Sequence, residues 1–190
     1  MALILGMEGG GAIGNLDTAR ASLDGVTLSD NQVNGAGGAI TNRGILAIAN
    51  SSLVRNLGWF GGAISTQSYD IFDPAVLTLS NTLIAENVVT SPGQASGGGL
   101  FDSGQSTIIT YTRFISNSAK TRGGGIAREG GIERLTEVTF DSNTTDGAGG
   151  GLSSRGGSSG IRLSIDRSLF VGNRAGLSGG GMATIAPGAW

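Results

Sequence analysis

Apolar and polar positions recur along this chain in three motifs. The first is an apolar residue, two variable residues and then Asn, and a second apolar residue stands eight positions before each of these Asn residues. The third is Gly-Gly, a small residue or none, and then an apolar residue. Successive Asn residues are 25, 31, 30, 26 and 30 positions apart. One apolar-x-x-Asn carries no information, but six copies at near-fixed offsets from Gly-Gly indicate a repeat protein.

The repeats define four sets of equivalent positions. The first motif runs over Leu28–Asn31, Leu53–Asn56, Ile84–Asn87, Phe114–Asn117, Phe140–Asn143 and Phe170–Asn173. The second apolar set is Leu23, Ile48, Leu79, Ile109, Leu135 and Ile165. The third motif ends at Ile13, Ile40, Ile64, Leu100, Ile126, Leu152 and Met182.

The period predicts a right-handed parallel β-helix, an all-β, three-sided solenoid of about six to seven coils. Short segments rich in β-branched residues, such as 107–111, alternate with Gly, Asn and Ser clusters. No repeat contains a helical pattern of ten residues, which argues against leucine-rich, ankyrin and TPR architectures. We expect residues 1–190 to form a single β-helix domain that is a segment of a longer chain.

Stacked coils turn each repeated position into a column along the axis. The three apolar sets then form three inward-facing stacks, and the Asn residues form a structural column (Asn31, Asn56, Asn87, Asn117, Asn143 and Asn173) whose amides hydrogen-bond from coil to coil. Because Asn tolerates the left-handed conformation, we expect this column to turn the chain at one corner. The Gly-Gly pairs should supply positive φ at another corner.

The composition excludes several classes of chemistry. Gly accounts for 36 residues, charged residues are only 14%, and His and Cys are absent. Without Cys or His the chain cannot build a disulfide, a zinc ribbon or a Ser–His–Asp triad. The net charge of −2 argues against nucleic-acid binding, and no run of about 18 apolar residues predicts a membrane span. The first residues lack the basic flank of a signal segment, so we expect a mature form or a fragment. We predict no cofactor and no metal ion.

The motifs resemble a known family. Gly37-Gly38-Ala39-Ile40 and Gly61-Gly62-Ala63-Ile64, together with the FxxN segments at Phe114, Phe140 and Phe170, are similar to the GGAI and FxxN repeats of polymorphic outer-membrane-protein passengers. This resemblance implies a passenger displayed at the cell surface or outside the cell, used in adhesion and without catalytic residues. The first three apolar-x-x-Asn segments depart from the family pattern, because they have Leu or Ile in place of Phe.

The longest interruption of the repeat, Ser65 to Ala75, marks a candidate contact site. Trp59, Phe60, Tyr69 and Phe72 lie in or beside it, which concentrates four of the ten aromatic residues within fourteen positions. These rings could stack on a glycan or on a host or cell-surface protein. The alternative is that Trp59 and Phe72 only pack this loop onto the coil.

Two rival functions remain open at this point. Asp70 and Asp73 could serve a polysaccharide lyase or glycosidase, with Arg43 or Arg55 as a base. The sequence shows no acids in matching register on neighbouring coils, so we expect a non-catalytic structural or adhesive segment rather than an enzyme. The second rival is end-to-end self-association into a filament, since a β-helix has open ends.

Overall fold

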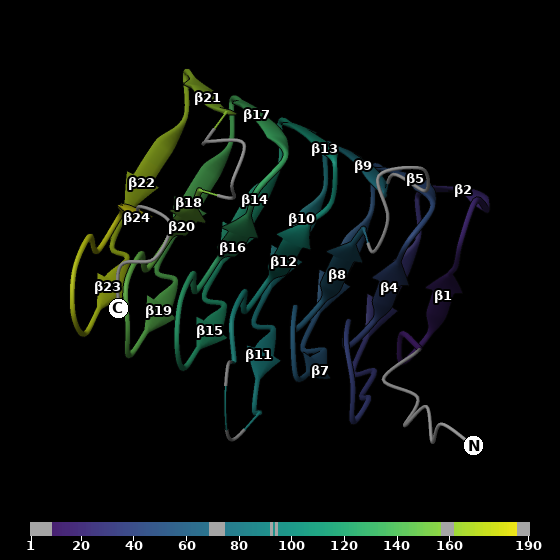
Figure 1. Ribbon diagram of the computed structural model, residues 1–190, viewed down its shortest axis with the longest axis horizontal. Coiled ribbons are helices and arrows are strands. Elements are labelled where there is room, and N and C mark those ends of the chain that lie inside the picture. Colours follow the sequence, from purple (N-terminus) through teal and green to yellow (C-terminus); the bar gives the residue numbers. More distant parts are fainter. Residues whose placement is uncertain (1–8, 69–74, 92, 94, 157–161, 186–190) are drawn as a thin grey trace.

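The chain folds as a parallel β-helix built only from short strands (Figure 1). The computed structural model describes residues 9–68, 75–91, 93, 95–156 and 162–185. Within these residues every pair of neighbouring strands is parallel and no helix occurs. Each coil contributes one strand to each of up to four sheets, here named A, B, C and D, so each sheet grows along the axis by one strand per coil.

Sheets A and B contain all the strands of four or five residues. Sheet A contains β1 (Ile13–Asn15), β4 (Ile40–Asn42), β8 (Ile64–Gln67), β12 (Leu100–Ser103), β16 (Ile126–Glu129), β20 (Leu152–Arg155) and β24 (Met182–Ile185). Sheet B contains β2 (Arg20–Asp24), β5 (Ile45–Ala49), β9 (Val76–Ser80), β13 (Ser106–Thr110), β17 (Ile132–Thr136) and β21 (Arg162–Asp166).

Sheets C and D complete each coil. Sheet C contains β3 (Thr27–Ser29), β6 (Ser52–Val54), β10 (Leu83–Ala85), β14 (Arg113–Ile115), β18 (Thr139–Asp141) and β22 (Leu169–Val171). Sheet D has two-residue strands: β7 (Leu57–Gly58), β11 (Val88–Val89), β15 (Ser118–Ala119), β19 (Thr144–Thr145) and β23 (Arg174–Ala175).

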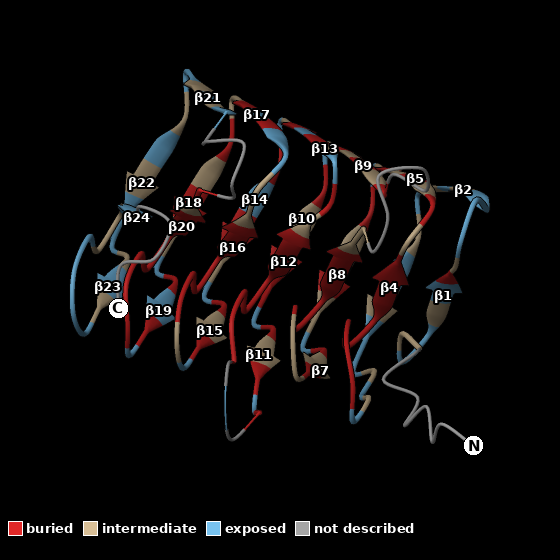
Figure 2. Ribbon diagram, viewed as in Figure 1, coloured by how far each residue is buried: buried red, intermediate tan, exposed pale blue. Residues whose placement is uncertain are grey.

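The strand registers confirm the three apolar stacks predicted from the repeat. Each set occupies one sheet: the Gly-Gly-apolar set lies in sheet A, the second apolar set in sheet B and the apolar-x-x-Asn set in sheet C, each residue paired with its equivalent on the next coil. All three face the interior, and the middle coils bury these side chains completely (Figure 2). Sheet D, which the motifs did not predict, lies outside this three-sided arrangement.

Aromatic stacking reinforces the core in the later coils. The ring centroids of Phe114 and Phe140 are 5.3 Å apart, and those of Phe140 and Phe170 are 4.6 Å apart, with interplanar angles of 11° and 9°. Phe114 and Phe140 are fully buried, whereas Phe170 is half-buried in a coil nearer the end. A buried aromatic side chain of this kind contributes about 3 kcal/mol, so this stack is a main source of stability.

The expectation that the column Asn residues adopt the left-handed conformation is wrong. The residue immediately before each Asn does so instead; these are Asp30, Arg55, Glu86, Ser116, Ser142 and Gly172. The reason is that the column residues from Asn31 to Asn143 donate their own backbone N–H along the axis to the Asn side chain of the next coil, as Asn117 does to Asn143 at 3.0 Å. The sharp turn therefore falls one residue earlier. From Gly37 onward the first Gly of each Gly-Gly pair has positive φ, as predicted, for example +66° at Gly37 and +72° at Gly149, whereas Gly10 in the first coil does not.

Sheet D forms an arm that leaves the main coil and returns against sheet A. Val89, Ala95 and Ala119 form a small apolar cluster inside this arm, separate from the main core. Where the arm returns, the hydroxyl of Thr41 donates to the carbonyl of Ala36 at 2.6 Å. As a result, residues on the outward face of sheet A are buried as well: Thr41, Ser65, Phe101, Ala127 and Ser153.

Candidate functional site

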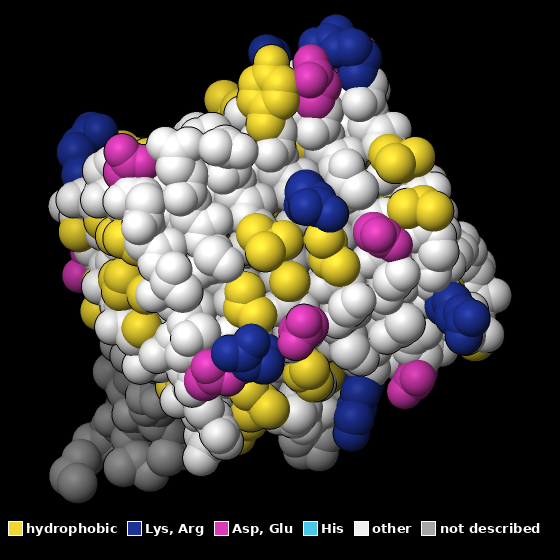
Figure 3. All heavy atoms as spheres, turned by 180° about the vertical axis from the view of Figure 1, so that it is seen from behind, with side chains coloured by type: hydrophobic (Ala, Val, Ile, Leu, Met, Phe, Trp, Pro, Cys, Tyr) yellow, Lys and Arg dark blue, Asp and Glu magenta, His cyan; other side chains and the backbone are white. Residues whose placement is uncertain are grey.

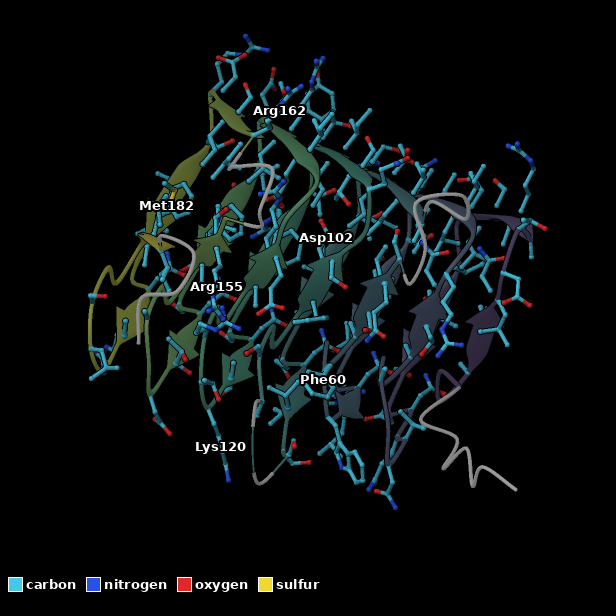
Figure 4. The ribbon with its side chains drawn as sticks, viewed as in Figure 1. Phe60, Asp102, Lys120, Arg155, Arg162 and Met182 are labelled. Carbon is cyan, nitrogen blue, oxygen red and sulfur yellow. The ribbon has the colours of Figure 1, made fainter. Side chains whose placement is uncertain are left out.

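The structure assigns a packing role to part of the predicted aromatic platform. Trp59 and Phe60 follow β7 on the arm and are half-buried. Phe60 packs against Phe101 on the outward face of sheet A, with ring centroids 5.4 Å apart and tilted by 55° (Figure 4). Tyr69 and Phe72, together with Asp70 and Asp73, lie outside the described residues. Phe60 therefore joins the arm to sheet A.

The Asn column is a continuous hydrogen-bonded ladder. The side-chain amide of each Asn donates to Oδ1 of the Asn on the following coil at 2.9–3.0 Å, from Asn31 through to Asn173. From Asn56 onward, the same amide also donates to a backbone carbonyl of the previous coil, as Asn117 does to Ile84 at 2.9 Å. Asn87, Asn117 and Asn143 are fully buried. The column therefore satisfies its polar groups inside the protein and holds the coils in register.

A second polar column runs inside sheet A, and the motif analysis missed it. It occupies the position two residues after the apolar residue of the third motif: Asn15, Asn42, Thr66, Asp102, Arg128, Ser154 and Thr184. Strand alternation places this position on the same inward face as the apolar stack. The signal was present in the sequence, because all seven residues at this offset are polar. It could have been found by counting two residues forward from each repeat.

Three ionisable side chains of adjacent coils meet in the interior where this column faces sheet B. Asp102 lies on β12, Arg128 on β16 and Glu133 on β17 (Asp102 is labelled in Figure 4). Nε of Arg128 lies 3.3 Å from Oε2 of Glu133, and the side chains of both are 0% exposed. Arg128 also donates to the carbonyl of Gly131 and, at 3.3 Å, to the hydroxyl of Ser154. Neither carboxylate oxygen of Glu133 accepts a hydrogen bond within the described residues.

Burial controls the ionisation of both acids. The pKa of Glu133 is raised to about 8, mainly by desolvation and also by the nearby charge of Asp102, while the charge of Arg128 partly opposes both effects. Desolvation also raises the pKa of Asp102. The backbone N–H of Gly104, which donates to Oδ1 of Asp102 at 3.0 Å, partly opposes this rise. With one cation facing two carboxyl groups, the cluster is electrically balanced when it retains one proton.

This cluster can hold a proton inside the folded protein, but its geometry does not suit catalysis. The two acids and the arginine are at most 1% exposed, so a polysaccharide cannot contact them in this conformation. A pair of carboxyl groups can hydrolyse a glycosidic bond only if the bond lies between them. No group of three acids that could hold a metal ion occurs in the described part of the chain.

These features define a parallel β-helix whose coils are joined by a ladder of Asn side chains. A comparison with protein families matches one of these coils to a known repeat. Residues 137–155 match the Chlamydia polymorphic membrane protein (Chlamydia_PMP) repeat. This segment contains Phe140 to Asn143 and the Gly-Gly-Gly-Leu turn that ends at Leu152. The chain thus carries a repeat of the polymorphic-membrane-protein type, as the GGAI and FxxN motifs predicted. Comparisons with curated proteins and with solved structures gave no match.

The strands account for all regular structure in the described residues. None of these residues belongs to a helix long and apolar enough to cross a lipid bilayer.

Proposed function

We propose that this chain is a non-catalytic β-helix segment of a cell-surface protein, and that it acts by presenting its outer surface to a binding partner. The repeat match at 137–155 is the observation that carries this proposal, because the matched family is one of membrane proteins. The burial of Asp102 and Glu133 supports it, since the acids that the fold brings together are closed to solvent.

Surface labelling tests the location. Intact cells that produce the full protein should expose an epitope inserted into this segment to antibody and to added protease, whereas a cytoplasmic marker in the same cells stays protected. An epitope detected only after the cells are lysed would contradict a surface role.

A turnover assay tests the absence of catalysis. Polyuronate and neutral glycan substrates should remain intact with and without Ca²⁺. Cleavage that disappears in the Asp70→Asn, Asp73→Asn double variant would instead establish the polysaccharide enzyme.

Self-association is a second candidate, in which a second molecule would cover the apolar side chains of the last described coil. Leu177 is 82% exposed and Met182 is 39% exposed there. Electron microscopy of the purified chain should show filaments if this candidate is correct, and Leu177→Asp should then disperse them. Single particles in the unmodified protein would exclude it.

A further inference from the structure

A polar groove runs along the outside of the corner between sheets B and C. It has a volume of about 340 Å³. Four successive coils line it, and the lining includes Gly25, Asn50, Asn81, Tyr111 and Arg113. Three coil spacings of about 4.8 Å give the groove a length of about 14 Å. Figure 3 shows the molecule from behind, where most of the surface is uncharged and the charged side chains occur singly or in pairs. A groove of hydroxyl and amide groups fits this general character of the protein.

Tyr111 closes one end of the groove. It occupies the same column as Gly25, Asn50 and Asn81, and all four have positive φ because the chain turns sharply here. Gly25 has no side chain, and Asn50 and Asn81 have short ones. Tyr111 instead carries an aromatic ring and is 59% exposed. An exposed aromatic ring at the end of a polar groove offers a flat apolar face beside hydrogen-bonding groups.

The amides in the groove are already oriented by the protein. Asn81 donates to Oδ1 of Asn50 at 2.8 Å, and Asn50 donates to Oδ1 of Asp24 at 2.7 Å. Each amide group has two N–H donors, so one donor on each of Asn50 and Asn81 remains for a ligand. Because these side chains are fixed before binding, less conformational entropy is lost when a ligand binds.

Arg113 brings a positive charge to the same end as Tyr111. It lies on the outward face of β14, in register with Leu83, and its side chain is exposed. No ion pair of Arg113 is recorded with any described residue, in contrast to Arg55 and Arg167, which pair with acids of neighbouring coils. A guanidinium group that is not held in an ion pair can bind a carboxylate or sulfate through two parallel hydrogen bonds.

We propose that this groove binds an acidic oligosaccharide. The ring of Tyr111 stacks on one sugar, Arg113 pairs with the carboxylate or sulfate of that sugar or the next, and Asn50 and Asn81 bond to the hydroxyl groups of the units that follow. A peptide fits less well, because peptides bind by adding to a free sheet edge or by filling apolar pockets. The strands at the centre of the groove, β5, β6, β9 and β10, are paired on both sides. The inference rests on the proposed binding function and specifies its ligand and location.

Calorimetric titration of the purified chain tests the site, with uronic-acid oligomers, sulfated oligomers and their neutral counterparts as probes. The informative variants are Tyr111→Asn and Arg113→Gln. Asn already occupies the Tyr111 column at two other coils, so Tyr111→Asn removes the ring without backbone strain. Arg134→Gln, on the outward face of β17 in sheet B, serves as the matched control for the loss of one exposed arginine.

The expected result is binding of acidic oligomers that weakens with added salt. Arg113→Gln should reduce affinity for them about tenfold and leave affinity for neutral oligomers unchanged, since one charged contact of about 1.4 kcal/mol corresponds to a factor of ten. Tyr111→Asn should weaken binding of both kinds, and Arg134→Gln should bind as the unmodified protein does.

Three outcomes would overturn the inference: no binding of any oligomer, equal binding by all variants, or an equal loss in Arg134→Gln and Arg113→Gln. None of these affects the surface-labelling result, so the proposed surface location can stand while the groove assignment fails. The reverse also holds, because groove binding by the purified chain does not depend on where the protein resides.

Discussion

Nε of Arg128 lies 3.3 Å from Oε2 of Glu133, and both side chains are completely buried. Glu133 occupies an inward column of sheet B that holds Leu46, Leu77 and Leu163 on other coils. A pair of ionisable side chains has therefore replaced apolar packing at one level of the helix. Removing Arg128 would be costly, because the carboxyl groups of Glu133 and Asp102 would stay buried without their cation.

The raised pKa of Glu133 predicts that the protein loses stability as the pH rises. The carboxyl group holds its proton up to about pH 8 in the folded state, but only to about 4.5 when unfolded. The folded state thus binds more protons between these values, so this group lowers the free energy of unfolding as the pH increases, by up to about 1.4 kcal/mol per pH unit. Its contribution is fully present below pH 4.5 and is lost above pH 8. Urea denaturation at several pH values measures this slope.

Two variants identify the source of the slope. Glu133→Gln removes the titrating group and should flatten the profile between pH 4.5 and 8. Asp102→Asn removes a neighbouring negative charge that helps to raise the pKa of Glu133, so it should move the loss of stability to lower pH. A profile that keeps its slope in Glu133→Gln would show that Glu133 is not the source of the slope and would point to Asp102, whose pKa burial also raises.

Phe140→Ala should lower the free energy of unfolding by about 3–5 kcal/mol, because it removes a fully buried ring between two stacked rings. Phe170→Ala is the matched comparison and should cost less, since Phe170 is half-buried and stacks on one side only within the described residues. Chemical denaturation of both variants measures the difference. Equal and small losses would contradict the role of the aromatic stack.

Asn117→Asp should destabilise the ladder by several kcal/mol near neutral pH. The substitution replaces two N–H donors by an oxygen that faces the carbonyl of Ile84 and Oδ1 of Asn143. Because burial disfavours the ionised form, the folded pKa of the new acid is raised, and the deficit should shrink in acid and grow as the pH rises. Asn81→Asp, in an exposed pair with Asn50, is the control and should change stability by less than about 1 kcal/mol. Equal effects at both sites would argue against the buried ladder.

Gly149→Ala should be among the most destabilising single-methyl changes. Gly149 has a φ of +72°, and a Cβ atom there would lie 2.4 Å from the carbonyl oxygen of Leu152. The left-handed conformation alone costs Ala about 1–2 kcal/mol, and the clash adds to it. Gly25→Ala separates the two effects, because Gly25 also has positive φ but has no atom within 4 Å of the added Cβ. Thermal unfolding should show a large decrease for Gly149→Ala and a smaller one for Gly25→Ala, which incurs only the conformational cost of about 1–2 kcal/mol.

The sequence by itself determined the architecture and the three apolar stacks. The second apolar residue stands eight positions before every column Asn, so the corner between sheets B and C has constant length and the register can be read by counting. The polar column through Asp102 and Arg128 also has a constant spacing, two residues after each apolar residue of the third motif, so it was predictable in principle. Columns follow from sequence because each coil repeats the one before it.

Only the tertiary structure decided which columns face one another. The step from sheet A to sheet B is eight residues from Ile40 to Ile48 but fifteen from Ile64 to Leu79, so spacing does not reveal that Asp102, Arg128 and Glu133 share one interior space. The contact of Phe60 with Phe101 also depends on how the arm returns to sheet A. These contacts arise between different sheets across corners of variable length, where the packing of the whole coil, and not the repeat, sets the distance.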